Sequence, residues 1–155
     1  MPASAIIHVN ASPRVRGLSR ATIVAWLGDL VVREGGSRGE VSLTFVDTAT
    51  MTDLNERYTG RSGTTDVLAF SQQEGEHPAP DPGLLGDVIV DVQQVRAQAR
   101  DYGVTMHEEM LRVVAHGVLH LLGYDHVTPE EETRMRRAEQ RCLRRFGRRH
   151  DPRCV

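Results

Sequence analysis

The segment from Thr105 to Leu122 constrains the fold of this chain more than any other, because its apolar residues fall on nearly every side of a helix. These residues are Met110, Leu111, Val113, Val114, Val118, Leu119, Leu121 and Leu122. A helix that is hydrophobic all round has to be buried. Thr105 and Glu108 have the spacing of a capping box, which marks the beginning of such a helix. The sequence therefore predicts a central helix around which the other elements pack.

The same helix carries two histidines, His116 and His120. Residues four apart lie on one face of a helix, so both imidazoles can point at one ion. Gly123 supplies the left-handed turn that ends a helix, after which the chain can bend back and present His126. Three nitrogen ligands leave a fourth tetrahedral position for water, as in catalytic zinc sites. We therefore predict one zinc ion bound by the three histidines; the alternative is that they are ordinary surface or core residues.

The histidine spacing is also that of the metzincin peptidases, His-Glu-x-x-His-x-x-Gly-x-x-His, in which the Glu acts as general base. Gly117 follows the first histidine here, so the carboxylate that a peptidase uses to activate water is missing. A metallopeptidase is therefore the second choice. A glycine inside a helix is unfavourable by about 1 kcal/mol relative to Ala. Close packing, or access for a substrate beside the metal, would explain it.

The rest of the chain alternates strand and helix patterns. We expect strands at 5–9, 41–46, 65–70 and 84–90, and helices at 19–33, 50–58, 92–102 and from 129 onward. This alternation predicts a single α/β layered domain with a mostly parallel four-stranded sheet and about five helices. The two strands that flank the Pro-rich segment 72–83, predicted to be a mobile loop, are expected to add an antiparallel edge.

Composition excludes several classes of protein. No apolar run approaches the roughly 20 residues that span a bilayer, and the N-terminus has no signal-peptide pattern, which predicts a cytoplasmic protein. The two cysteines, Cys142 and Cys154, are too few for a disulfide framework. All 19 basic residues are Arg, and nine of them lie between Arg134 and Arg153. That cluster could bind phosphates or be a solvated helix face. We assign 1–147 to the domain and 148–155 to an Arg-rich tail.

Several blocks of the sequence resemble one known family. The block from His116 to His126, followed by Met135-x-x-x-Glu139, is similar to the YbeY-type rRNA maturation factors, which are single-strand-specific, metal-dependent endoribonucleases. Three upstream blocks occur in the order and spacing of that family: Leu54-Asn55-x-x-Tyr58, Thr65-Asp66-Val67-Leu68-x-Phe70 and Leu85-Gly86-Asp87-Val88-Ile89. The likeness covers about residues 40–145.

The resemblance implies a zincin-like α/β fold, a cytoplasmic location, and action in maturing the 3′ end of small-subunit rRNA and in ribosome quality control. The three motif histidines of the family bind zinc, and they correspond to His116, His120 and His126. Implied partners are rRNA, the ribosome or its small-subunit precursor, and a ribosomal protein or assembly GTPase. The family has Arg directly after the Tyr of the first upstream block, where it contacts RNA phosphate or stabilises charge. This chain has Thr59 there, and Arg61 is our candidate replacement; the alternative is weaker or differently organised catalysis.

We therefore predict metal-assisted cleavage of phosphodiester bonds in single-stranded RNA, with attack by water or by the 2′-hydroxyl left open. Zinc lowers the pKa of a bound water to about 7, so no adjacent Glu is required. Asp125 is expected either to orient a ligating imidazole or to be a turn residue before His126. A third hypothesis is a ribosome-assembly factor whose zinc only stabilises the fold.

The other polar residues near these motifs are expected to have structural roles. Tyr124 should pack, and Asp66 should cap a turn rather than line the cleft. Arg112 should pair with Glu108 one turn before it. The remaining histidines are expected on the surface or in loops: His8, His77, His107 and His150.

Overall fold

The computed structural model describes residues 5–11, 18–35, 39–73 and 83–147. Three predictions from the sequence fall partly or wholly outside these ranges: the Arg-rich tail with Cys154 and His150, the central part of the predicted loop, and His77.

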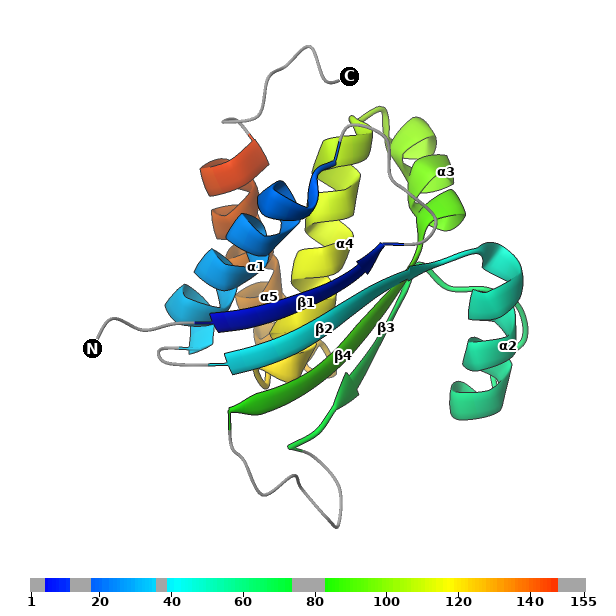
Figure 1. Ribbon diagram of the computed structural model, residues 1–155, viewed down its shortest axis with the longest axis horizontal. Coiled ribbons are helices and arrows are strands. Elements are labelled where there is room, and N and C mark those ends of the chain that lie inside the picture. The colour runs from blue at the N-terminus through cyan, green and yellow to red at the C-terminus, as the bar shows by residue number, and fades with distance from the viewer. Residues whose placement is uncertain (1–4, 12–17, 36–38, 74–82, 148–155) are drawn as a thin grey trace.

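A four-stranded sheet forms the base of the molecule (Figure 1). Its strands are β1 (Ala5–Ala11), β2 (Gly39–Val46), β3 (Val67–Ser71) and β4 (Leu84–Asp91), in the spatial order β1-β2-β4-β3. β1 and β2 are parallel, as are β2 and β4, whereas β3 pairs antiparallel with β4. The prediction of a mostly parallel sheet with an antiparallel edge is confirmed. Alternate residues of β2 are buried, which indicates that one face of the sheet is covered more fully than the other.

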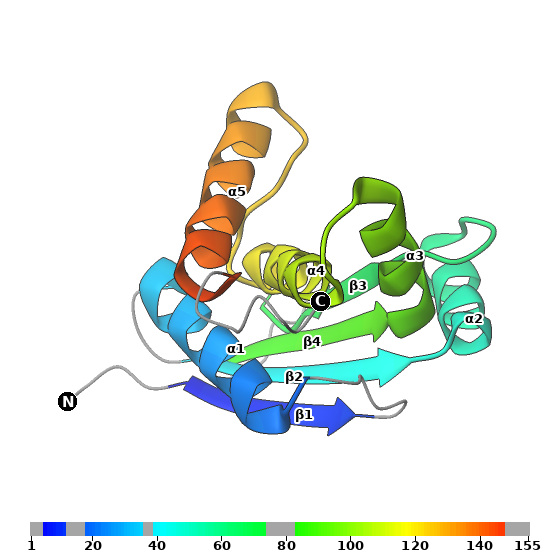
Figure 2. The same cartoon turned by 90° about the horizontal axis from the view of Figure 1, so that it is seen from above.

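Five α-helices lie within the described ranges. They are α1 (Arg20–Gly35), α2 (Thr48–Thr59), α3 (Val92–Tyr102), α4 (Met106–Leu121) and α5 (Pro129–Cys142), and a π-helical turn (Leu143–Gly147) follows the last. Figure 2 shows α1, α3 and α4 on one face of the sheet, with α5 beyond α4 and with α2 past the ends of the strands. None of the described helices combines the length and the apolar character needed to cross a membrane.

The helix α4 lies at the centre, as its all-round apolar pattern predicts, and it packs against β3, β4, α1, α3 and α5. Its glycine is explained by close packing. A Cβ atom on Gly117 would lie 2.7 Å from Cγ1 of Val88 and 3.0 Å from Cγ2 of Val67. Since Val88 is fully buried in β4, only a residue without a side chain lets α4 lie this close to the sheet.

Thr105 caps α4 as predicted, since its Oγ1 accepts from a backbone N–H of the first turn at 3.0 Å. Two further predicted helix starts are also borne out. The Oγ of Ser19 accepts a hydrogen bond from the backbone N–H of Thr22 at 3.1 Å, at the beginning of α1. Thr128 and Glu131 form a reciprocal capping box at the beginning of α5, with Pro129 in the first turn. These caps satisfy N–H groups that a helix leaves without intrahelical partners.

Candidate metal centre

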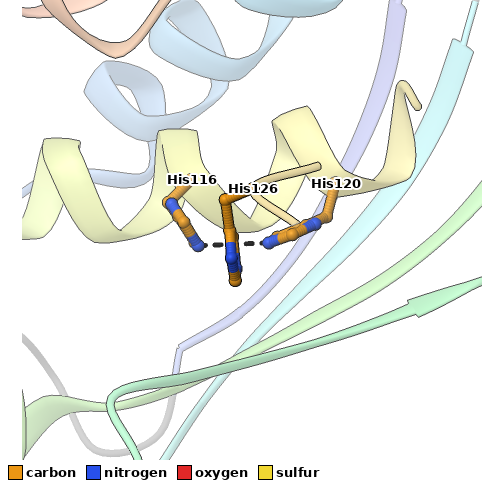
Figure 3. A group of neighbouring side chains, drawn as sticks. All are labelled: His116, His120 and His126. Carbon is orange, nitrogen blue, oxygen red and sulfur yellow. Dashed lines mark hydrogen bonds between the residues drawn. The ribbon is translucent and has the colours of Figure 1, made fainter. Parts of the chain in front are cut away.

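The structure brings together the three histidines whose spacing predicts a metal site. His116 and His120 project from one face of α4, and His126 returns toward them from the loop that follows (Figure 3). One ring nitrogen from each lies within 4.8 Å of the other two. The Nε2 atoms of His116 and His120 are 3.1 Å apart. Three nitrogen donors therefore point toward a common space.

This donor set fits a tetrahedral metal ion. Zinc–nitrogen bonds of about 2.0–2.1 Å in a tetrahedron separate two ligand nitrogens by about 3.4 Å. The observed separations, from 3.1 Å to at most 4.8 Å, span that value. Neutral imidazoles suit zinc and other borderline transition metals. The cluster can hold a metal ion.

The turn after α4 determines where His126 lies. Gly123 has a φ of +98°, a backbone conformation that L side chains rarely adopt. The next amide, that of Tyr124, donates to the carbonyl of Leu119 at 3.0 Å, so the chain reverses over the end of α4. The Oδ1 of Asp125 then accepts from the backbone N–H of His126 at 2.8 Å. Of the two roles expected for Asp125, this contact is that of a turn residue.

Glu139 in α5 fixes the ring of His116. Its Oε1 lies 2.6 Å from Nδ1 of His116, and both side chains are largely buried, at 13% and 28% exposure. A carboxylate only accepts, so Nδ1 carries the hydrogen and Nε2 offers its lone pair to the cluster. The sequence motif contained Glu139, yet gave it no role. A signal was present, because Glu139 lies one turn from the buried residues Met135 and Cys142 and so falls beside the inward face of α5.

The environment of His120 favours the neutral imidazole that binds metal. Burial lowers the pKa of His120, and repulsion from His116 and His126 lowers this pKa further, while Asp125 acts in the opposite direction. A lower pKa keeps the imidazole neutral toward more acidic pH. Only neutral imidazole coordinates a metal, so the surroundings of His120 favour coordination.

The three histidines open onto a cavity of about 410 Å³. Asp66 lines this cavity, and its Oδ2 accepts from Nε2 of Gln98 at 3.1 Å, so the expectation that it serves mainly as a turn cap is wrong. Tyr124 also borders the cavity, while its hydroxyl donates to Glu34 at 2.8 Å in a packing role. Arg61 is exposed and is not among the lining residues. The structure does not bring it into the cavity.

The remaining polar residues differ in part from expectation. Arg112 does not pair with Glu108; it binds Glu109 through two hydrogen bonds, from Nε to Oε1 at 2.6 Å and from Nη2 to Oε2 at 2.8 Å. The spacing of three residues brings Arg112 to the buried acid instead of the exposed one. His8 is exposed and contacts Glu40 at 2.7 Å, whereas His107 is half-buried against the ring of Trp26.

Comparisons with known proteins agree with these features. The family described as Endoribonuclease YbeY matches residues 13–147. A protein of that name from Symbiobacterium thermophilum is 43% identical over 116 residues, which cover 72% of this chain and 74% of the relative. One from Pelotomaculum thermopropionicum is 46% identical over 114 residues, with 72% and 75% covered. The solution structure of TM1509 from Thermotoga maritima shares the fold, with a TM-score of 0.63, 24% identity and coverage of 95% of this chain and 98% of the other.

Proposed function

This chain belongs to the YbeY family of endoribonucleases, and from that premise we propose that it is a zinc-dependent endoribonuclease that cleaves single-stranded RNA. The observation that carries the proposal is the convergence of His116, His120 and His126 at the edge of a cavity. Three ligands with an open side are typical of catalytic zinc sites, whereas structural sites are closed by four protein ligands. One ion per chain is proposed.

Some residues of the site would bind the ion, and others orient those ligands. His116, His120 and His126 would hold the ion, which when bound supplies a Lewis acid that polarises a phosphoryl oxygen and acidifies water. Glu139 keeps the hydrogen of His116 on Nδ1, so that Nε2 is free to bind. Burial lowers the pKa of His120, which favours its neutral, metal-binding form. The ligands are therefore oriented before the ion arrives, which reduces the free energy needed to order them.

The surroundings of the cluster disfavour a peptide as substrate. The residue after His116 is Gly117, so the helix lacks the Glu that metzincins use as general base. The carboxylates among the lining residues of the cavity are Asp66 and Asp125, and each already accepts a hydrogen bond, from Gln98 and from the backbone N–H of His126. A peptidase is therefore disfavoured.

The cellular role proposed here is maturation of the 3′ end of small-subunit rRNA and ribosome quality control in the cytoplasm. Its support is membership of the family. The partners proposed are rRNA, the ribosome or its small-subunit precursor, and a ribosomal protein or an assembly GTPase that brings the enzyme to its substrate. Arg61, on the exposed loop after α2, is proposed as a contact for the RNA strand outside the cavity.

The alternative is a ribosome-assembly factor whose metal only stabilises the fold. Two histidine variants distinguish it from an enzyme. Purified wild-type protein, His116→Ala, His126→Ala and the control His8→Ala are compared for bound metal, for folding and for cleavage of unstructured and duplex RNA. His126 is exposed, so we expect His126→Ala to stay folded, to lose metal and to lose cleavage of the unstructured strand. His8→Ala should behave as wild type. A folded, metal-free variant that cuts RNA as fast as wild type would overturn the proposal.

A further inference from the structure

A second cavity, also of about 410 Å³, lies between α4 and α5 beside the metal centre. His116 and His126 line both cavities, so the rings of these two histidines border both spaces. The other residues that line the second cavity are Arg112, Glu132, Met135, Arg136 and Glu139. A strand that lies across the three histidines therefore has a cavity on either side of it, lined in part by the same rings.

Arg112 is the best-fixed cation of this second cavity. Its guanidinium binds Glu109 through two parallel hydrogen bonds, and Glu109 is itself only 1% exposed. The ring of Tyr102 lies 5.8 Å from Cζ of Arg112, within the range of a cation–π contact. These contacts hold the guanidinium in one place, so binding an anion there requires little further ordering of the side chain.

The guanidinium still has hydrogen-bond capacity. Arginine has five N–H donors, and Glu109 takes one from Nε and one from Nη2. No further hydrogen bond joins this guanidinium to any residue that the structure describes. The two carboxylates that line the cavity are otherwise engaged, Glu132 with Arg136 at 2.7 Å and Glu139 with His116 at 2.6 Å. Three N–H groups of Arg112 are therefore available to an external acceptor.

The position of Arg112 relative to the metal ligands suits a polymer of phosphates. Arg112 and His116 are four residues apart on α4, so their side chains leave the same face of the helix, from Cα atoms about 6 Å apart along its axis. Successive phosphates along a single strand are separated by a similar distance. We propose that Arg112, in the cavity between α4 and α5, binds the RNA phosphate adjacent to the one at the metal centre. This inference rests on the proposed function, because it places an RNA strand across the histidines.

The test measures how strongly salt weakens binding of a single strand. Fluorescence anisotropy follows the binding of a labelled, 2′-O-methylated strand whose integrity is checked on a gel. The central variant is the double substitution Glu109→Gln, Arg112→Gln, which removes the cation without leaving Glu109 charged and buried. Losing one phosphate contact lowers the slope of log K against log salt by about 0.7 for single strands. At low salt the affinity should fall about 10-fold or more, as for a charge-assisted hydrogen bond.

Two matched variants separate this effect from a change in packing. Glu109→Gln alone keeps the cation of Arg112, so the salt slope should stay that of wild type. Arg33→Gln removes one cation, from an i,i+4 pair with Asp29 on α1, and a cation that contacts no phosphate should leave the slope unchanged when it is lost. If the double variant does not fold, Arg112→Lys serves instead, since it retains a cation beside Glu109. It should bind several-fold more weakly because the planar fork is lost, and wild-type affinity in this variant would contradict the proposal.

The outcomes distinguish this inference from the proposed function, because the binding slope requires no turnover. If wild type cleaves unmodified RNA but the double variant keeps the full slope, the phosphate site is wrong and the nuclease stands. If the slope falls but wild type cleaves nothing, the phosphate site stands and the nuclease is wrong. Absence of any binding by wild type would overturn both.

Discussion

Replacing Glu139 should weaken metal binding by an amount that depends on what replaces it. The contact to be changed is the 2.6 Å hydrogen bond from Nδ1 of His116 to Oε1 of Glu139. A hydrogen bond to a charged group contributes about 1.5–3 kcal/mol, roughly twice a neutral one. Glu139→Gln keeps a neutral acceptor and so loses about half, or 0.8–1.5 kcal/mol. This corresponds to a roughly 4- to 13-fold weaker affinity for zinc. Glu139→Ala removes the acceptor altogether, and the loss should be about 10- to 100-fold.

Competition with a chromogenic chelator at fixed pH measures these affinities directly. The matched control is Glu132→Gln on the same helix, because Glu132 pairs with Arg136 and is 56% exposed. We expect zinc affinity to decrease in the order wild type and Glu132→Gln, then Glu139→Gln, then Glu139→Ala. Equal affinity in Glu139→Ala and wild type would refute the argument that this carboxylate orients a ligand. A loss of similar size in Glu132→Gln would show that the general negative charge of α5, not the hydrogen bond, determines the affinity.

Three further predictions concern packing and ionisation. Alanine in a helix is favoured over glycine by about 1 kcal/mol, so Gly28→Ala in α1, where nothing lies within 4 Å of the new Cβ, should be more stable than wild type. Gly117→Ala gains the same helix propensity, but the new Cβ overlaps Val88, which costs about 1–3 kcal/mol. In urea denaturation, Gly117→Ala should therefore be less stable than Gly28→Ala by that cost, and equal stabilities of the two variants would contradict the packing argument. The hydrogen bond from Arg141 lowers the pKa of Glu34 below its usual 4.5 despite partial burial. The contribution of Glu34 to stability is therefore complete above pH 4.5 and decreases as the pH falls through the lower folded-state pKa. Denaturation measured from pH 3 to 7 should show a smaller loss of stability at acid pH for Glu34→Gln than for wild type, and an equal loss would contradict this reasoning. Burial raises the pKa of Cys142 to about 12, so in a Cys154→Ser background a thiol reagent at pH 8 should react only after unfolding, and rapid labelling of the native protein would refute the burial of this thiol.

The sequence predicted the central helix and the metal ligands because both are local patterns. His116 and His120 share a face through helix geometry alone, and Gly123 adopts the positive φ that turns the chain back toward these histidines. The burial of α4 follows from its all-round apolar surface, which no other position in an α/β domain accommodates. The antiparallel edge was also predictable, since β3 and β4 are consecutive strands and the Pro-rich sequence between them carries no helical pattern of the kind that joins parallel strands.

The residues that tune the site were not predictable, because they depend on how helices pack. Glu139 lies 23 residues after His116, and its contact exists only because α5 crosses α4 at one particular place. Asp66 faces the histidine cavity for a similar reason, since it precedes the edge strand that packs on α4. No periodicity in a single segment encodes these distances.

The wrong prediction of the partner of Arg112 explains why the sequence did not indicate a cation in the cavity between α4 and α5. Spacing alone offers Arg112 two acids, Glu108 and Glu109, and the helix rule for ion pairs favours the one four residues away. Burial decides otherwise: Glu109 faces the interior, and a buried carboxylate without a cation is far more costly than an exposed one. Pairing with Glu109 also draws the guanidinium toward the cavity between α4 and α5, whereas Glu108 is exposed. The desolvation of one acid thus determines where the guanidinium of Arg112 is held beside the metal ligands.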